Sequence, residues 1–412
     1  MKKLLIIFLS IVIFLPLYAQ DGDDVFAQED TVKERFTFER QRFEMGFDFG
    51  AGVANDIIGR KDIFTKDIII DMNDIEGDMS DDGINLSADF FSDFFLTIKK
   101  IRIGQGKWDI GFFSGGDGEV SFNLPKNLVT LIAKGNSGQS VFDGMISARG
   151  GVYANAGFDV SAEYGKLRVG VRHLLYTPLL YIPKSGINYH LDTSNGVDLT
   201  ASGDIEVYSP FITSDNLEFN GLKFGFNFST DGTYALFPFL DVGGSLINIP
   251  LVPAKVQNRM KLTLSGINHW GFNGQDLVNG EGFDELDLDF DDSYDSSVVK
   301  VYKPFRFDAF ARYKPFNTEL FSIIPNIGFT VDINDSEGFF NAGLALELNI
   351  RYGFILGVGM GRVEGLWKHQ LDLIFNLRAF ELALAASLQS QGFRDSFRMS
   401  GFGFGLGISF GW

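Results

Sequence analysis

The last eleven residues of the chain, 402–412, read FGFGLGISFGW. Large apolar residues stand at every even position, and glycine or serine stands at every odd position. A period of two produces two distinct faces only in an extended strand. One face of this strand is therefore bulky and apolar, and the other has almost no side chains. In a transmembrane barrel the bulky face meets lipid and the small face points into the lumen.

The same alternation recurs along the chain, in segments separated by short turns and by longer polar stretches. A strand that crosses the apolar band of a membrane at a tilt needs roughly ten residues, and most of the segments have that length. The segments before the terminal one are 43–53, 86–98, 108–112, 146–162, 167–175, 222–228, 240–246, 260–264, 305–313, 321–333, 340–350, 354–360, 371–379 and 380–388. The pattern predicts an all-β protein, a transmembrane antiparallel barrel of about 14 strands.

Composition limits the functional classes. The 412 residues include no cysteine, which excludes disulfides and thiolate chemistry, and the net charge of −18 argues against nucleic-acid binding. Residues 1–19 have the lysines and short apolar run of a signal peptide. Residues 20–40 are charged and predicted to be a flexible segment, and residues 41–412 form the barrel. An exported protein without an apolar helical span is periplasmic, secreted or an outer-membrane barrel, and the strand pattern favours the cell outer membrane.

Charged and amide residues alternate with the apolar ones, which argues against a soluble sandwich or a periplasmic binding protein. A barrel of this size is too wide for side chains to fill, so the polar face can line a wet lumen. The predicted lumen-lining residues are Arg149, Arg168, Arg172, Arg306, Asp308, Arg312, Asp372 and Arg378. The arginines either attract anions or carboxylate groups, or form salt bridges with Asp159 and Asp308 that stiffen the wall.

The period of two is interrupted over residues 117–145. Within this stretch, residues 124–135 have helical spacing behind a proline and end at a glycine. This helical insert is predicted to sit in the barrel mouth or to plug the lumen; a surface-loop helix without a role is the alternative. The plug residues would be Leu124, Leu128, Leu131 and Ile132.

Three long polar loops are predicted over 55–84, 183–220 and 266–297, the second of which could also be a hairpin extension. The carboxylates of residues 284–295 could bind divalent cations, although the segment lacks the spacing of an EF-hand loop. No histidine pair, nucleophile elbow or phosphate-binding loop is found, so we expect no enzyme activity, no cofactor and no resident metal.

Several of these features resemble the long-chain fatty-acid transporter (FadL-like) family and its relatives in spirochaetes and Bacteroidetes. They are the helical insert 124–135, the hairpin 150–175, the LINIP sequence at 246–250 with Pro253 and Ala254, and the terminal Trp412. The resemblance implies a monomeric 14-stranded barrel with an N-terminal hatch, taking up hydrophobic compounds through a lateral opening. It also implies that Phe410 and Trp412 are recognised by the barrel-assembly machinery. The family's Asn-Pro-Ala near the mature N-terminus is absent, so the helical insert would have to replace the hatch.

Three functions remain open at this stage. The first is passive uptake of small hydrophobic or amphipathic molecules such as fatty acids. The second is a general diffusion porin for hydrophilic solutes. The third is a surface adhesion or structural barrel that binds partners through its long loops.

Overall fold

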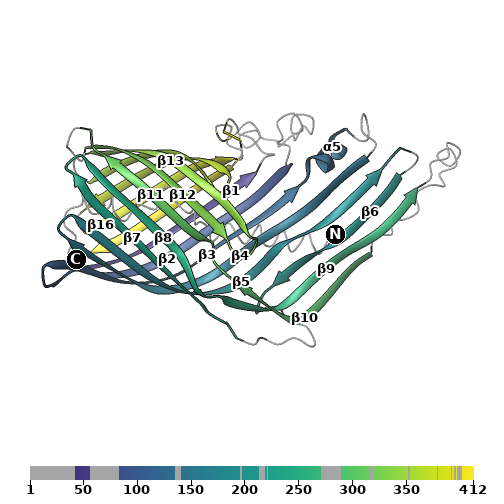
Figure 1. Cartoon of the computed structure of the whole chain (residues 1–412), viewed down its shortest axis with the longest axis horizontal. Coiled ribbons are helices and arrows are strands. Elements are labelled where there is room, and N and C mark those ends of the chain that lie inside the picture. Colours follow the sequence, from purple (N-terminus) through teal and green to yellow (C-terminus); the bar gives the residue numbers. More distant parts are fainter. Residues whose placement is uncertain are drawn as a thin grey trace.

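The computed structural model shows a closed barrel from which a curved sheet projects at one end (Figure 1). Residues 1–41 lie outside the described part of the chain, and so do the predicted signal peptide and flexible segment. The described residues are 42–55, 83–134, 141–194, 197–212, 219, 221–270, 289–315, 320–350, 353–377, 379–390, 392–393, 396 and 401–412.

Seventeen strands and one helix are described, and nearly all of the strands are as long as a membrane crossing requires. The first group is β1 (Phe43–Asn55), β2 (Ile84–Ile103), β3 (Gly106–Leu124), α5 (Lys126–Lys134), β4 (Val141–Tyr164), β5 (Leu167–Asp192) and β6 (Val197–Tyr208). The second is β7 (Gly225–Phe237), β8 (Leu240–Val252), β9 (Ala254–Trp270), β10 (Asp289–Val301), β11 (Phe305–Tyr313) and β12 (Phe321–Asp332). The last is β13 (Glu337–Ile350), β14 (Phe354–Val363), β15 (Leu366–Leu377), β16 (Phe380–Ser390) and β17 (Gly401–Gly411).

Fourteen of these strands close into an antiparallel ring, which confirms the predicted fold. The ring follows chain order except that β7 pairs with β5 and β11 pairs with β8. The terminal strand β17 pairs with β1 over eleven residues, from Glu44 opposite Gly411 to Ala54 opposite Gly401. Because the first and last strands pair with each other, the ring leaves no open edge.

The two faces of the wall have the polarity that the terminal strand predicts. In β17, Phe402, Phe404 and Phe410 are exposed, whereas Gly401, Gly403, Ser409 and Gly411 are buried. The same alternation places buried polar residues inside β11, where Arg306 is buried and Phe307 is exposed. An apolar outer face and a polar inner face are the signature of a barrel that spans a membrane.

Glycine and aspartate face each other repeatedly on the inner side of the wall. A Cβ at Gly407 would lie 2.6 Å from the Asp48 carboxylate, and one at Gly52 would collide with Asp89. Further pairs in register are Gly111 with Asp159, Gly170 with Asp231 and Gly328 with Asp308. The abundance of glycine therefore reflects room for inward carboxylates as well as turns.

Pairs of aromatic rings lie at strand ends on the side of the barrel that carries the C-terminus; Figure 1 marks that end of the chain. Trp412 lies 5.0 Å from Phe43, Trp108 lies 6.0 Å from Tyr164, and Phe239 lies 6.2 Å from Tyr313, between ring centroids. Such rings form a girdle at one membrane–water interface of a barrel.

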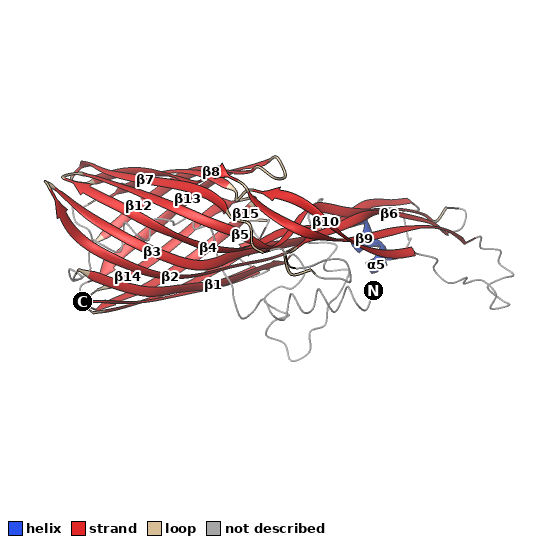
Figure 2. Cartoon of the chain, turned by 90° about the horizontal axis from the view of Figure 1, so that it is seen from below, coloured by secondary structure: helices blue, strands red, loops and turns tan. Residues whose placement is uncertain are grey.

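The projecting sheet is made by the distal halves of β4 and β5 together with β6, β9 and β10 (Figure 2). This corrects the predicted loops at 183–220 and 266–297: β5 continues to Asp192, and β6, β9 and β10 occupy much of both stretches. For 183–220 the alternative of a hairpin extension is the one that the structure has. The interruption predicted over 117–145 is also too wide, because β3 continues to Leu124 and β4 begins at Val141. The predicted loop at 55–84 lies almost wholly outside the described residues.

The helix α5 packs on the outer face of this sheet. Val129 packs against Ile84, and Leu128 and Leu131 pack against a cluster that contains Phe142 and Tyr189. In register, Ile84 and Phe142 belong to the same outer face as the exposed Phe94 and Phe158. Among the described residues no helix is long and apolar enough to span a membrane.

A substitution on the outer face should destabilise the barrel far more than one on the inner face. Leu371 in β15 is 42% exposed, and its neighbour Gln370 points inward and is 7% exposed. We expect Leu371→Lys to lower the free energy of unfolding by about 2–4 kcal/mol, because the ammonium group would lie in hydrocarbon. Gln370→Lys is the matched control, since Lys368 already points inward two residues away. Guanidinium titration of the barrel in lipid vesicles measures both, and equal losses would contradict the assignment of the faces.

Candidate functional site

Adjacent wall strands are interrupted at one level of the barrel. Residues 209–224 separate β6 from β7, Pro253 separates β8 from β9, and residues 302–304 separate β10 from β11. Proline has no N–H to donate to the ladder, and Asn248, five residues before Pro253, adopts a positive φ of 54°. The strand β5 runs past this break, pairing with β7 on one side of it and with β6 on the other.

An aromatic cluster lies on the inner face at the level of the break. We call it the luminal cluster, and its buried members pack against the partly buried Phe95 and Val299. The buried members are Phe113, Tyr153, Leu174, Tyr176, Tyr181, Tyr208, Ala254, Val256 and Val301. The inner wall, largely polar apart from a small aliphatic cluster of Ile355, Ile374 and Ala383, is thus aromatic as well as apolar at this level.

The hydroxyl of Tyr176 holds the two sides of the break together. It donates a hydrogen bond to the carbonyl of Val301 at 3.0 Å and accepts one from the backbone N–H of Ala254 at 3.2 Å. The side chain is fully buried, and its ring packs edge-on against Tyr153 at 6.2 Å. One side chain on β5 therefore satisfies backbone groups of β9 and β10 where regular pairing stops.

Two cationic side chains lie beside the luminal cluster. Lys303 forms an ion pair with Asp117, lies 3.3 Å from the side-chain oxygen of Asn155, and sits 5.3 Å from the centre of the Tyr153 ring. On the other side, the guanidinium of Arg172 lies 4.3 Å above the ring of Phe113. Each of these cations rests on an aromatic face, which stabilises it away from bulk water.

The predicted lumen-lining residues occupy several separate places on the inner wall. Arg306 pairs with Asp308 at 2.7 Å, Arg312 pairs with Glu347 at 3.5 Å, and Arg149 pairs with Glu337. Elsewhere, Arg168 lies 3.5 Å from the hydroxyl of Ser161, and Asp372 accepts a hydrogen bond from Gln370 at 2.8 Å. Only Arg172 lies at the luminal cluster. Arg378 lies outside the described residues.

The helix predicted as a plug does not lie inside the barrel. It spans Lys126–Lys134, so Leu124 belongs to β3, while the side chain of Ile132 lies outside the described residues. Leu128 and Leu131 turn toward the outer face of the projecting sheet because that face presents apolar side chains to an amphipathic helix. The helix therefore covers the wall from outside, at the end away from the aromatic girdle.

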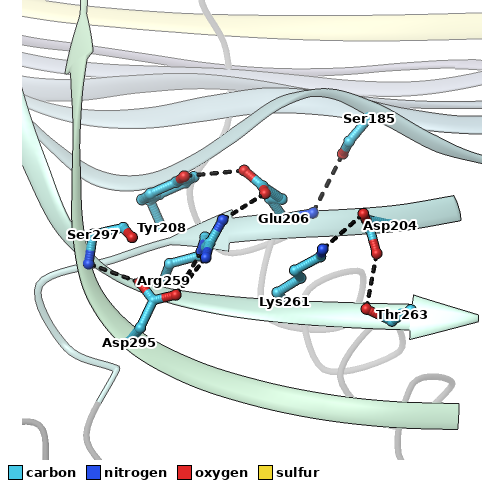
Figure 3. A network of polar contacts seen from close by, with 9 residues as sticks. All are labelled: Ser185, Asp204, Glu206, Tyr208, Arg259, Lys261, Thr263, Asp295 and Ser297. Carbon is cyan, nitrogen blue, oxygen red and sulfur yellow. Dashed lines mark hydrogen bonds and ion pairs between the residues drawn. The ribbon is translucent and has the colours of Figure 1, made fainter.

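The opposite, polar face of the projecting sheet carries a network of ion pairs (Figure 3). Arg259 on β9 bonds to Glu206 on β6 at 2.8 Å and also pairs with Asp295 on β10. Next to it, Lys261 pairs with Asp204 at 2.8 Å, and Thr263 donates to the same carboxylate at 2.8 Å. These contacts join strands that are far apart in the sequence.

The same network accounts for part of the acidic segment 284–295. Asp295 accepts hydrogen bonds from Arg259, which lower the pKa of its carboxyl to about 2. Residues 284–288 lie outside the described part of the chain. Within the part that is described, no group of three or more metal-ligating side chains comes together, and divalent cation binding stays a prediction.

Sequence reasoning missed the residues that define the luminal cluster. Tyr153 and Tyr176 stand in the polar phase of their strands, between charged and amide residues such as Arg149, Asn155 and Arg172. Aromatic residues at these inward-facing positions were the available signal, because a water-filled lumen alone does not require aromatic side chains.

No protein-family description and no curated protein matches the chain. Solved structures that are similar include the toluene transporter TodX of P. putida, with 10% identity, 92% of each chain covered and a TM-score of 0.47. The toluene transporter TbuX of Ralstonia pickettii has 9% identity, 90% of each chain covered and a TM-score of 0.45. A FadL homologue of Pseudomonas aeruginosa has 9% identity, 91% of each chain covered and a TM-score of 0.44. One of these three structures is thus a homologue in the FadL family, which the sequence also resembles.

The hydroxyl of Tyr176 should matter more than that of its neighbour in the cluster. We expect Tyr176→Phe to lower the free energy of unfolding by about 1–3 kcal/mol, because it leaves a buried N–H and a buried carbonyl without their partner. Tyr181→Phe is the control, since its hydroxyl makes no hydrogen bond with any described residue. Hydrogen exchange at residues 254–256 and 299–301 should rise in the first variant only; unchanged exchange would contradict the role of the hydroxyl.

The network around Arg259 should weaken in acid. Because the folded pKa of Asp295 lies below its ordinary value of 3.8, its stabilisation is complete above that value and is lost as the pH falls towards about 2. We expect limited pepsin digestion at pH 2 to cut β9 and β10 before the barrel. Arg259→Gln should produce faster cutting already at pH 4, where Lys107→Gln, which removes an exposed lysine at the other end, should not. Equal cutting of the two variants at pH 4 would refute this role of Arg259.

Proposed function

We propose that the protein gives small hydrophobic or amphipathic molecules a passive path across an outer membrane. The observation that supports this proposal is the luminal cluster, which places aromatic and aliphatic side chains together on an inner wall that also carries many buried polar and charged side chains. A wet channel for ions and sugars has no use for such a surface, whereas an apolar molecule gains free energy on each contact with it.

The charges beside the cluster extend the proposal to amphipathic molecules such as fatty acids. Arg172 lies over Phe113, and Lys303 lies near Tyr153, so a cation stands at each of two rings. A molecule with an apolar tail and a carboxylate could place its tail on the rings and its head near one of these cations. The path supplies no energy, and transport follows the concentration gradient.

A general diffusion porin is the second candidate. It is favoured by the ion pairs that line the rest of the inner wall, among them Arg312 with Glu347 and Lys314 with Asp241 at 2.9 Å. Recording in a planar bilayer separates the two candidates, because a porin gives a large, stable conductance. We expect only small or unstable conductance from this barrel.

Surface binding is a third candidate. The observation that favours it is the projecting sheet, whose polar face carries acidic side chains well beyond the barrel. Such a face suits a basic partner outside the cell.

Vesicle uptake tests the leading proposal. Liposomes that contain the protein should take up radiolabelled toluene and oleate faster than empty liposomes. Phe95→Asp should slow toluene uptake about fivefold or more, because it places a carboxylate against the luminal cluster. Ser387→Asp is the matched control, since this buried side chain lies on β16 opposite Gln370 and Gly403 and outside the luminal cluster. Uptake equal to that of empty liposomes would reject the proposal, and a large, stable conductance in its place would support the porin.

A further inference from the structure

Three lysines lie side by side on the outer face of the wall at the break. Lys255 on β9 stands directly opposite Lys300 on β10 in the antiparallel register, and an isolated bridge pairs Lys223 with Lys255 on the other side. All three residues are exposed. We call them the lysine row. Like charges placed directly opposite each other across strands destabilise a sheet unless something neutralises them.

The neighbours of the lysine row show which way it points. Ala254 and Val256 flank Lys255 and are buried in the luminal cluster, while Lys300 stands between the buried Val301 and the partly buried Val299, which packs against the cluster. Since successive side chains of a strand point to opposite faces, Lys255 and Lys300 point away from the lumen, and the bridge places Lys223 beside Lys255. None of the three forms an ion pair with a carboxylate of the described residues, so the charge of the row is not neutralised from within that part of the chain.

Exposed apolar side chains lie close to the lysine row in the chain. Phe224, which follows Lys223, is 58% exposed, and Leu251, four residues before Lys255, is 55% exposed. Phe211 and Phe219, in the segment between β6 and β7 that leads to Lys223, stack on each other at 5.8 Å and are also exposed. A water-soluble surface rarely leaves such residues uncovered, whereas a membrane surface covers them with acyl chains.

The height of the lysine row agrees with a membrane surface. The strands β7 and β8 run for 13 residues each between the aromatic girdle and the break. At about 3.4 Å per residue and a tilt of about 40°, they rise roughly 30 Å, slightly more than the apolar band of about 25 Å. The ammonium groups therefore reach the level of lipid head groups on the side opposite the girdle.

We infer that the lysine row is a binding site for an anionic membrane lipid, whose phosphate meets the ammonium groups and whose acyl chains lie on the apolar residues beside them. A phosphate group offers several acceptor oxygens to the three donors of each lysine. It would remove the repulsion within the row, and the acyl chains would cover the wall at the point where regular strand pairing is interrupted. The site does not depend on transport through the lumen, because it lies on the opposite face of the same strands.

Native mass spectrometry of the detergent-solubilised barrel tests this inference. The probes are phosphatidylglycerol, phosphatidylcholine with the same acyl chains, and inorganic phosphate as a competitor. We expect phosphatidylglycerol to bind at least tenfold more tightly than phosphatidylcholine, and the variant K223Q/K255Q/K300Q to lose that preference. Equal binding of the two lipids by the unchanged protein would overturn the inference.

The matched control is K100Q/K107Q/K166Q, which removes three exposed lysines at the rim near the short turns. It should keep the preference, and an equal loss in this variant would mean that only net charge matters. A second control, F224S/L251S, should weaken lipid binding and leave the row's attraction for inorganic phosphate unchanged. Full displacement of the lipid by an equal concentration of inorganic phosphate would identify a free-phosphate site and contradict the lipid site. If the triple variant does not show the heat-modifiable migration of a folded barrel, K255Q alone, at the centre of the row, replaces it.

Discussion

Backbone pairing between β1 and β17 is the contact on which the remainder of this structure depends. An unpaired N–H or carbonyl in hydrocarbon costs several kcal/mol, so a sheet can cross a membrane only when its first and last strands meet. Here they meet over eleven residues, and the glycines of β17 lie on the inner side of that seam. The closed ring fixes the inner circumference, and with fourteen strands the lumen is too wide for side chains to fill. The inner wall must therefore tolerate water, and its opposing glycines and aspartates meet that need.

The same requirement explains where the wall can be interrupted. Within hydrocarbon, a break in three wall strands would expose backbone groups that no water could reach. In this barrel the break falls about one membrane thickness above the aromatic girdle, where head groups and water are available. On the inside, the hydroxyl of Tyr176 replaces the missing ladder contacts of Ala254 and Val301. At this one level the wall thus combines irregular backbone, inward aromatic rings and outward lysines. The backbone groups and the lysines are near water and head groups, whereas the rings face the lumen.

The fold was largely predictable because its evidence is periodic. Alternation in β17 and its repetition along the chain suffice for a closed barrel of this size, and Phe402 and Phe404 do face outward. The projecting sheet was not predictable in the same way. Its strands carry Asp204, Glu206, Arg259 and Lys261, which read as a polar loop until the cross-strand ion pairs place them opposite one another. Pairing between residues more than fifty positions apart leaves no local trace in a sequence. The helix was predictable from the spacing of its apolar residues, but that spacing does not determine on which face of the sheet the helix packs.

The candidate site shows a more general limit of prediction from sequence. Polar residues that line a wet lumen and aromatic residues that form the luminal cluster both occupy inward-facing positions of a strand, so the alternation does not distinguish them. Arg172 and Tyr176 both point inward from β5, four residues apart, and only the closed ring shows that the tyrosine meets Tyr153 and the arginine meets Phe113. Their neighbourhood also gives a reason for the ion pair of Lys303 beside the ring of Tyr153. An isolated cation next to an apolar surface would hold water and anions there, whereas the ion pair of Lys303 with Asp117 is nearly neutral from a distance. A neutralised and partly aromatic stretch of lumen presents a barrier to small ions and a favourable surface to apolar molecules. The proposed selectivity for hydrophobic compounds would then require no moving part, because it would follow from which side chains the break brings together.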